Sequence, residues 1–393
     1  MAQKYLIISL EFPPFKGGIA KYAINLVKNL ICDGNDVSVL TKRFPDPENR
    51  KNREFKVFYF PSYNNRILWK AFLLSGFLIL TTILCKRNKF SHIIIVDPAS
   101  AFLFPLVSGF VNVPFDIVLY GSELGRYQNS IFTRTVFRWA LLKAGNLWCI
   151  SRYTAEMLDQ RYAIKNNNEV LRCGVEEKFL SEVLNQPSQN ELRKRYNLED
   201  TDYIIGTIAR LVPRKGHSRV IEALPELLKQ IPNIKYLIVG VGESAEYLKE
   251  HACSFGVEQI VIFTGEIEEQ ELIAHYDLLN LYVMLNTPIS YTIEGFGISF
   301  IEAAARGVPS IGCENGGVSE AISERISGLL IQSADKEEFI SRVVEIFCNP
   351  SDWDAVKMKE FARQFSWRKI TSKIISQHQL DEPDKKTCSR VKE

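Results

Sequence analysis

Short apolar runs alternate with segments of helical periodicity along most of this 393-residue chain. In the first half we predict strands at residues 4–10, 35–41, 56–61, 92–96, 115–120 and 146–150. Apolar runs of this length, separated by helices, are typical of βαβ units in which helices cover parallel sheets. Asp97-Pro98 is predicted to cap the helix after the fourth of these strands. The chain is therefore predicted to be an α/β protein, and its length favours two domains.

A turn with two glycines, Gly295 and Gly297, precedes a helical run at residues 298–306. The free N–H groups and the positive dipole end of a helix that begins at such a turn bind anions such as a diphosphate. Glu294 precedes that helix and Glu302 lies inside it, and carboxylates accept hydrogen bonds from the hydroxyls of a sugar or a ribose. The alternative is a buried helix with a glycine turn and two surface glutamates.

Two cations occupy the end of a predicted strand and the loop after it. Arg210 ends the apolar run at residues 203–210, and Lys215 follows in the loop. In that position they would neutralise a diphosphate, whose departure in a transfer reaction concentrates negative charge. The alternative is two surface cations on a loop. His217 is predicted to lie on a helix face and not to act in catalysis.

The spacing of these residues resembles the signatures of a known enzyme family. Glu294, seven residues and Glu302, with Gly-Phe-Gly directly after the first glutamate, together with Arg210-x4-Lys215-Gly, resemble the retaining glycosyltransferases of family 4, the glycosyl transferases group 1. The resemblance covers most of residues 4–380. It implies the GT-B fold, in which two Rossmann-like domains face each other across a cleft. It also implies transfer of a hexose-type sugar from a nucleoside diphosphate sugar to an acceptor, with no cofactor and no metal ion.

By this resemblance Glu294, Arg210 and Lys215 are the predicted catalytic residues. Glu294 would hold the sugar hydroxyls, and the two cations would meet the charge of the departing diphosphate. No carboxylate stands out as a covalent nucleophile, so we expect the acceptor to attack from the face that the leaving group occupies. That course retains the anomeric configuration.

Further residues are predicted to bind the donor. They lie at glycine turns or near helix starts, and they are Gly17, Gly18, Gly240, Phe296, Gly297, Ile298 and Glu302. Glu302 would hold the ribose, and the backbone amides of 296–298 would hold the diphosphate. Gly17 and Gly18 resemble the opening loop of the family, which contacts the donor phosphate and the acceptor.

The acceptor side departs from the family pattern. Tyr120 stands where the family usually has a histidine beside the donor sugar, and a tyrosine is not a base at neutral pH. Its ring can stack and its hydroxyl can donate one hydrogen bond. Glu123 is a candidate contact for a hydroxyl, and an exposed loop carboxylate is its alternative.

Gly240-Val241-Gly242 raises a rival function, because it matches the dinucleotide fingerprint Gly-x-Gly-x-x-Ala with Glu266 about twenty residues on. An NAD-dependent oxidoreductase is therefore one alternative, and a non-catalytic sugar-nucleotide binding protein is another. The fingerprint normally follows the first strand of its domain, whereas here it follows the second. It also leaves the two cations and two glutamates unexplained, so we favour the transferase.

Charge is distributed unevenly along the chain. Residues 1–190 carry 24 Lys and Arg against 15 Asp and Glu, a net +9, and the remainder carries 24 against 31, a net −7. A basic first half suits an anionic membrane surface or a lipid pyrophosphate, and no motif indicates nucleic-acid binding. The uncharged run 71–84, with basic flanks, predicts a helix of about 21 Å, too short for a hydrocarbon core of about 30 Å.

That apolar helix is either buried in the first domain, which we favour, or partly sunk in the membrane interface. We therefore expect a cytoplasmic protein that lies peripherally on the inner face of the cell membrane. The expected acceptor is a lipid-linked or cell-surface glycan, as in polysaccharide or lipopolysaccharide assembly. Eight cysteines without metal-ligand spacing indicate reduced thiols.

Four segments are predicted along the chain. An acceptor-side domain spans residues 1–185, and a donor-binding domain spans 186–366. A helix at 367–380 is expected to cross back to the first domain. A polar tail follows at 381–393.

Overall fold

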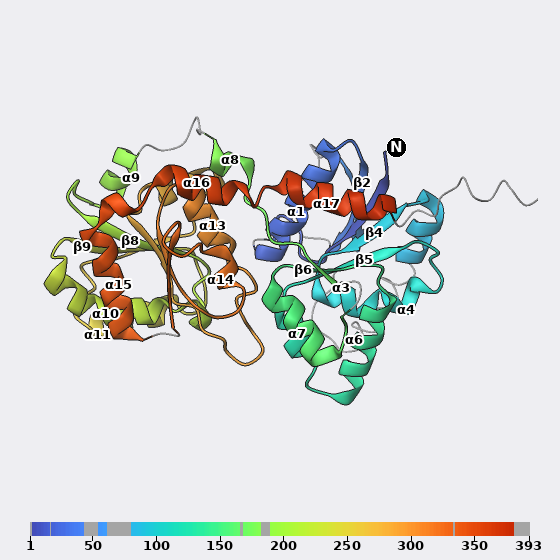
Figure 1. Ribbon diagram of the computed structural model, residues 1–393, viewed down its shortest axis with the longest axis horizontal. Helices are drawn as coiled ribbons and strands as arrows, with labels where there is room; N and C mark the ends of the chain where they lie inside the picture. The colour runs from blue at the N-terminus through green and yellow to red at the C-terminus, as the bar shows by residue number, and fades with distance from the viewer. Residues whose placement is uncertain are drawn as a thin grey trace, which may run out of the picture.

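The computed structural model describes residues 2–15, 17–42, 54–60, 80–165, 168–181, 189–332 and 335–380. Within these residues the chain forms two units, each with a wholly parallel sheet covered by helices (Figure 1). We call them the N-terminal unit, with strands β1 to β7, and the C-terminal unit, with strands β8 to β13. The prediction of two parallel α/β, Rossmann-like domains is confirmed.

The N-terminal sheet has the order β3-β2-β1-β4-β5-β6-β7. Its strands are β1 Lys4–Ile8, β2 Asp36–Lys42, β3 Lys56–Phe60, β4 His92–Ile95, β5 Phe115–Leu119, β6 Leu147–Cys149 and β7 Asn168–Val170. The first six coincide with predicted strands. Strand β7 was not predicted, because its three residues, two of them polar, form no apolar run.

Helices cover both faces of this sheet. They are α1 Gly18–Cys32, α3 Pro98–Leu103, α4 Pro105–Ser108, α5 Ser122–Arg126, α6 Ile131–Lys143 and α7 Arg152–Tyr162. The short helix α8 Glu177–Leu180 follows β7 and packs on the C-terminal unit (Figure 1). Asp97 caps α3 as predicted, because its carboxylate accepts a hydrogen bond from the Ser100 N–H at 2.9 Å.

The predicted apolar helix at 71–84 lies outside the described residues up to position 79. Residues 80–88 are helical, with Leu84 and Cys85 buried and Ile83 43% exposed. No helix in the described ranges is long and apolar enough to cross a membrane.

The C-terminal sheet has the order β10-β9-β8-β11-β12-β13. Its strands are β8 Tyr203–Ile208, β9 Ile234–Val239, β10 Val261–Gly265, β11 Leu281–Met284, β12 Ser310–Cys313 and β13 Gly328–Ile331. Its helices are α9 Gln189–Arg195, α10 His217–Gln230, α11 Ala245–Ser254, α12 Leu272–Asp277, α13 Ile298–Ala305, α14 Val318–Ala321, α15 Lys336–Cys348 and α16 Ala355–Arg363. The strand order reverses direction at β8, and ligands of such sheets bind at the carboxyl ends near that point.

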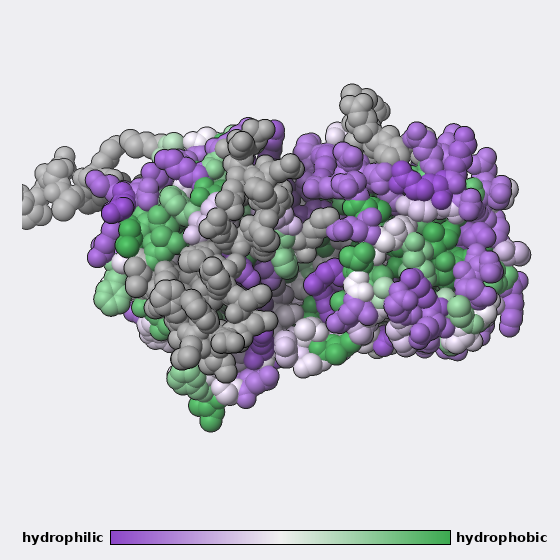
Figure 2. All heavy atoms as spheres, turned by 180° about the vertical axis from the view of Figure 1, so that it is seen from behind, coloured by the Kyte–Doolittle hydropathy of each residue, from purple (hydrophilic) through white to green (hydrophobic). Residues whose placement is uncertain are grey.

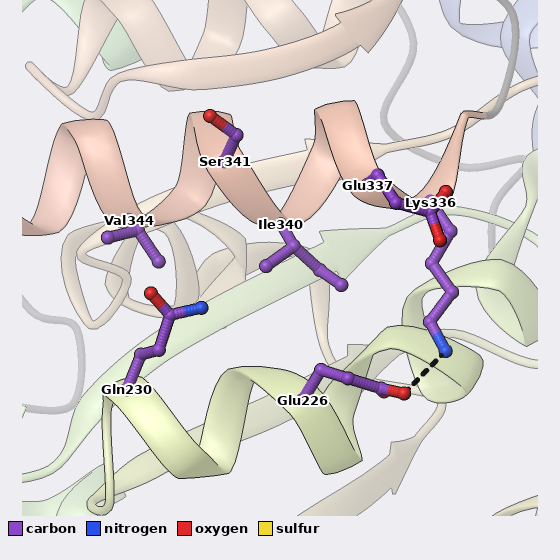
Figure 3. Close-up of a pocket in the computed structure, with 7 residues that line it drawn as sticks. All are labelled: Glu226, Gln230, Lys336, Glu337, Ile340, Ser341 and Val344. Carbon is purple, nitrogen blue, oxygen red and sulfur yellow. Dashed lines mark ion pairs between the residues drawn. The ribbon is translucent and has the colours of Figure 1, made fainter.

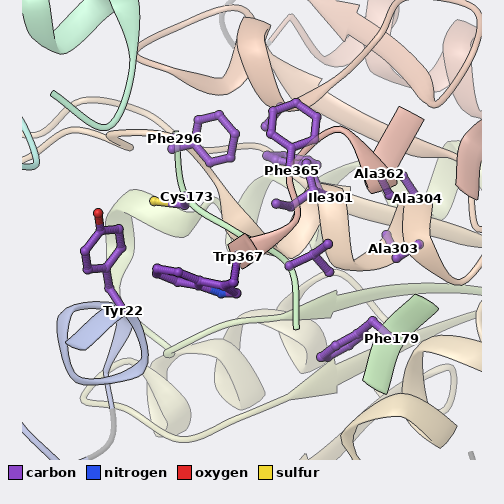
Figure 4. Packing of buried hydrophobic residues seen from close by; sticks show 14 of the residues in the cluster. Tyr22, Cys173, Phe179, Phe296, Ile301, Ala303, Ala304, Ala362, Phe365 and Trp367 are labelled. Carbon is purple, nitrogen blue, oxygen red and sulfur yellow. The ribbon is translucent and has the colours of Figure 1, made fainter. Parts of the chain in front are cut away.

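One apolar core runs through the junction of the two units (Figure 4). It contains Tyr22 and Cys173 on one side, Phe296 and Phe365 on the other, and Trp367 between them. The Tyr22 and Trp367 rings pack edge to face with their centroids 5.0 Å apart. The two units therefore share buried apolar surface, which holds the carboxyl ends of both sheets close together.

The last described helix, α17 Trp367–Leu380, returns from the C-terminal unit and packs on α1 (Figure 1). Its His378 Nε2 lies 2.6 Å from an oxygen of Asp116, in the middle of the N-terminal sheet. Asp116 also accepts hydrogen bonds from Trp148 Nε1 at 2.8 Å and from the Asn146 N–H at 2.9 Å. A buried carboxylate with several donors thus fastens the end of the chain to the first sheet.

Replacing Asp116 with alanine is expected to lower the free energy of unfolding by about 2 kcal/mol, because it leaves several buried donors without an acceptor. In thermal melting the midpoint should fall by about 4 °C or more. Asp33→Ala is the control, since Asp33 is exposed at the end of α1. Equal melting temperatures for the two variants would contradict this account of Asp116.

Candidate active site at the junction of the two units

Helix α13 begins at a turn that requires glycine at two positions. Gly297 has φ 92°, in the left-handed region, and a Cβ added to Gly295 would lie 2.3 Å from the carbonyl oxygen of Tyr120 in the N-terminal unit. No side chain caps the start of α13. The first N–H groups of the helix therefore point to the junction without a side-chain acceptor, as an anion site requires.

Glu294, just before this turn, is held between two cations. One of its oxygens accepts hydrogen bonds from Arg214 Nη1 and Lys215 Nζ, both at 2.6 Å. Burial by itself would raise the pKa of Glu294, but the charges of Lys215 and Arg214 outweigh it and lower the pKa to about 2. The side chain is therefore an ionised acceptor at neutral pH, and the surface-glutamate alternative is wrong for it.

The loop after β8 carries Arg210, Arg214 and Lys215, and we call it the cation loop. It differs in detail from the prediction. Lys215 lies beside Glu294; burial lowers the pKa of Lys215, and the charge of Glu294 opposes that shift. Arg210 is exposed and forms no ion pair with a described residue. Burial raises the pKa of Glu11 in the N-terminal unit, and the charge of Arg210 only partly opposes that rise. Arg214, not predicted, makes the direct contact with Glu294. The only sign of it in the sequence was its place beside Lys215.

Glu302 is buried inside α13, at 5% exposure, so the surface alternative is wrong here too. One of its oxygens pairs with Lys21 of α1, and the other accepts a hydrogen bond from the Tyr276 hydroxyl at 2.9 Å. Lys21 also lies 3.5 Å from Glu176. The carboxylate that the resemblance assigns to ribose is thus shared with a lysine from the other unit. The sequence analysis did not predict Lys21 or Tyr276.

Gly17 and Gly18 lie at the start of α1, where no side chain caps the helix. A Cβ on Gly17 would lie 3.8 Å from Glu11 Oε2, and one on Gly18 would meet no atom within 4 Å. Because Lys21 in the next turn contacts Glu302, the starts of α1 and α13 lie at the same junction. The first turn of α1 therefore packs against α13 at the junction, and the donor-binding role of Gly17 and Gly18 stays a prediction.

Tyr120 and Glu123 lie at the carboxyl end of β5. Glu123 is 2% exposed and accepts hydrogen bonds from the N–H groups of Tyr120 at 2.5 Å and Gly121 at 3.2 Å. Burial raises the pKa of Glu123. The Tyr120 ring packs edge to face on Tyr22. The exposed-carboxylate alternative for Glu123 is wrong, and its visible role is to order the turn that touches Gly295.

Gly240 directly follows β9, and its N–H donates to the Gly265 carbonyl at 3.0 Å. A Cβ on Gly242 would lie 2.3 Å from the Leu211 carbonyl, so this glycine allows close packing on the cation loop. The Gly240-x-Gly242 turn follows the second strand of its domain, whereas a dinucleotide-binding turn follows the first. The observed packing explains these glycines without NAD.

Further direct contacts join the two units at the junction. The Ile293 N–H donates to Ser122 Oγ at 3.2 Å, and the Ile293 side chain packs in the core of the N-terminal unit. Glu320 of α14 accepts hydrogen bonds from Arg172 Nε at 2.8 Å and from the Arg152 N–H at 2.5 Å. These contacts fix the glycine turn against the first unit.

A separate open groove of about 450 Å³ lies between α10 and α15, on the outer side of the C-terminal unit (Figure 3). Glu226 and Lys336 form an ion pair across it at 2.9 Å. None of the predicted site residues lines it. In the described part of the chain, no group of three or more His, Cys, Asp or Glu side chains is placed to hold a metal ion.

Two family models match the chain, one for each unit. Residues 16–179 match the model described as Glycosyltransferase Family 4, and residues 188–365 match the model described as Glycosyl transferases group 1. Together the two matches cover most of the chain.

Curated relatives match over part of their length. The chain is 31% identical over 222 residues to a GDP-mannose-dependent alpha-(1-6)-phosphatidylinositol monomannoside mannosyltransferase of Mycolicibacterium smegmatis. This alignment covers 55% of this chain and 57% of that protein. The chain is 27% identical over 183 residues to an alpha-monoglucosyldiacylglycerol synthase of Streptococcus pneumoniae. This alignment covers 46% of this chain and 40% of that protein. The alignments thus span a little over half of the first relative and less than half of the second.

Among solved structures, the chain is similar to Anabaena HepE in complex with UDP and glucose. The TM-score is 0.79 at 17% identity, with 96% of this chain and 100% of that chain covered. Both units and their arrangement are therefore shared. The first unit is thus similar to the Glycosyltransferase Family 4 model and the second to the Glycosyl transferases group 1 model, and the chain has the two-domain GT-B fold.

Proposed function

We propose that this protein is a retaining glycosyltransferase that moves a hexose-type sugar from a nucleoside diphosphate sugar to a lipid-linked or cell-surface glycan. The observation that carries the proposal is the position of Glu294, ionised between Arg214 and Lys215 at the uncapped start of α13. A carboxylate accepts hydrogen bonds from sugar hydroxyls, whereas the adjacent helix start and cations suit a diphosphate. Both ends of the donor thus find complementary groups within one turn of chain.

In the proposed reaction the bond between the anomeric carbon and the diphosphate oxygen breaks first. The sugar passes through an oxocarbenium-like state, and the bonding electrons leave with the diphosphate. Lys215 and Arg210, with the amides of 296–298, stabilise that charge as it develops. The acceptor hydroxyl attacks the same face and passes its proton to the departing diphosphate oxygen, so the configuration is retained. Neither Tyr120 nor a metal ion is assigned a part as base or Lewis acid.

The donor-binding role belongs to the C-terminal unit in this proposal. Glu302 holds the ribose after Lys21 gives up part of its contact, and Gly17, Gly18 and Gly240 shape the backbone around the phosphates. The domain limits stay as predicted: 1–185 for the acceptor side, 186–366 for the donor side, 367–380 for the returning helix and 381–393 for the tail.

The acceptor class is inferred from charge and from the names of relatives. The basic first half suits an anionic membrane surface or a lipid pyrophosphate. The two relatives are named for phosphatidylinositol monomannoside and for glucosyldiacylglycerol, both of which are glycolipids. We therefore propose a cytoplasmic enzyme that works peripherally at the inner face of the cell membrane.

A screen of nucleotide sugars tests the function. The purified protein is incubated with GDP-mannose, UDP-glucose and other UDP- and GDP-sugars, and free nucleotide is measured. We expect one donor to be turned over, and we expect that donor to raise the melting temperature while NAD does not. Turnover of no donor, with stabilisation by NAD, would favour the oxidoreductase; stabilisation by a nucleotide sugar without any turnover would favour the non-catalytic binding protein.

A further inference from the structure

Helix α6 exposes large apolar side chains that its own unit does not cover. Ile131 is 87% exposed, Phe132 74%, Leu142 55% and Trp139 40%. Exposed apolar residues are ordinary when they are scattered, but four on one 13-residue helix form a contiguous surface. We call these four residues the α6 patch. In Figure 2 hydrophobic side chains gather at the lower tip of the N-terminal unit, the region where Figure 1 places α6.

Helical geometry explains why the α6 patch is continuous. Successive residues turn by about 100°, which places all four side chains within about 100° of the helix circumference, with Ile131 and Leu142 along one edge of that sector and Phe132 and Trp139 along the other. The buried side of the helix holds Phe137, Ala140 and Leu141. Both sides of α6 are therefore apolar, one facing the sheet and the other facing outward. This arrangement differs from an ordinary surface helix, whose outer side is polar.

The charged residues of α6 and of its neighbouring sequence have a single sign. No Asp or Glu lies between Glu123 and Glu156, a stretch that contains the whole of α6. On the helix, Arg134 and Arg138 project on one side of the patch and Lys143 on the other. An apolar strip with basic side chains on both flanks is typical of helices that lie in a lipid interface.

The two arginines keep their charge available. Arg134 Nη2 donates to the Arg161 carbonyl at 3.2 Å, and Arg138 Nε donates to the Tyr162 carbonyl at 2.9 Å. A carbonyl orients a guanidinium without neutralising it. Both groups therefore stay cationic beside the apolar strip and can meet anionic headgroups.

Further exposed apolar side chains lie on elements next to α6. Helix α4 packs on α6; its Leu106 is 43% exposed, and Phe110, two residues after α4, is 71% exposed. On the other side, an open groove of about 420 Å³ adjoins Leu142 and is lined largely by apolar side chains. The acid in this groove, Asp159, pairs with Lys165 at 3.6 Å. The surface around the patch is thus apolar with a basic margin.

We propose that the α6 patch binds an anionic lipid bilayer, with α6 lying in the plane of the interface. The inference rests on the proposed function, because a lipid-linked acceptor would be met at that surface. Helix α6 follows α5 at the carboxyl end of β5, so its first residues, Ile131 and Phe132, lie on the side of the unit that carries Tyr120. A bilayer at α6 would therefore border the acceptor side of the junction.

Sedimentation with vesicles tests the proposal on the full-length protein. Vesicles of phosphatidylcholine with phosphatidylglycerol are compared with vesicles of phosphatidylcholine alone, at low and at high salt. We expect binding to the anionic vesicles that weakens with salt, because the basic flanks are screened. Changing Ile131 and Phe132 together to serine should weaken this binding about tenfold or more, because two apolar side chains no longer enter the interface.

The matched control changes two exposed apolar residues of the C-terminal unit, Tyr247→Ser with Val356→Ser, which are 56% and 63% exposed. This control should bind anionic vesicles as the wild type does. Equal binding by the α6 variant and the wild type, or an equal loss in the control, would overturn the proposal. So would a wild-type dimer that the α6 variant converts to a monomer, since the patch would then be a protein interface.

Donor turnover separates this inference from the proposed function. Release of nucleotide from a water-soluble donor should be unchanged in the α6 variant, because its two residues touch none of the site residues. Vesicle binding through α6 without turnover of any nucleotide sugar would contradict the proposed function but support the α6 patch as a lipid-binding surface. Turnover of a nucleotide sugar without vesicle binding would support the proposed function and overturn the α6 patch as a lipid-binding surface.

Discussion

Glu294→Gln is expected to lower kcat/KM for the nucleotide sugar by about 100-fold or more. Glutamine keeps the shape of the side chain but removes the charge that Arg214 and Lys215 neutralise. It also replaces a strong acceptor of sugar hydroxyls with a weaker one. A loss of this size corresponds to about 3 kcal/mol of transition-state stabilisation, as for a lost catalytic hydrogen bond. The measurement is steady-state release of free nucleotide.

The control for Glu294 is a glutamate that also has two cationic partners but lies far from the junction. Glu345 on α15 pairs with Arg342 at 2.8 Å and with Arg325 at 3.1 Å. Glu345→Gln should leave turnover unchanged. Full transfer activity in the Glu294 variants, whether to glutamine or to alanine, would remove the assignment of this residue to the donor.

Lys215→Met is expected to lower kcat/KM by about 100- to 1000-fold. Methionine fills the buried space of the lysine stem but leaves the departing diphosphate without its nearest buried cation. Glu294 would keep only Arg214 as a partner. Because Lys215 and Glu294 touch, the double variant should lose less than the product of the two single losses. The measurement is turnover of the same donor by all three variants.

Lys336→Met is the matched control, since Lys336 pairs with Glu226 across the outer groove of Figure 3. It should turn over donor at the wild-type rate. Independent, multiplicative losses from Lys215 and Glu294 would show that the two residues do not act as a unit. If an Arg210 variant lost more of its kcat/KM than Lys215→Met, then Arg210, and not Lys215, would be the main cation of the site.

Local patterns in the sequence determined the class of fold and one part of the site. Apolar runs at strand length located six strands of the first sheet, because burial of a strand on both faces leaves a continuous apolar run. Asp97 and the Gly295–Gly297 turn were likewise readable, since capping and positive φ each require particular residue types. The polar strand β7 carries no such pattern and was missed.

The tertiary structure alone decided which charged groups meet. Glu294 pairs with Arg214 and Lys215 about eighty residues earlier in the chain, and Glu302 pairs with Lys21 from the opposite unit. Periodicity reports whether a residue is buried but not which distant residue is opposite it. Those partners depend on which parallel strands become neighbours and on how closely the two units dock. The sequence therefore determined the helix start that can hold an anion, and only the packing of the two units gave its carboxylates their cations.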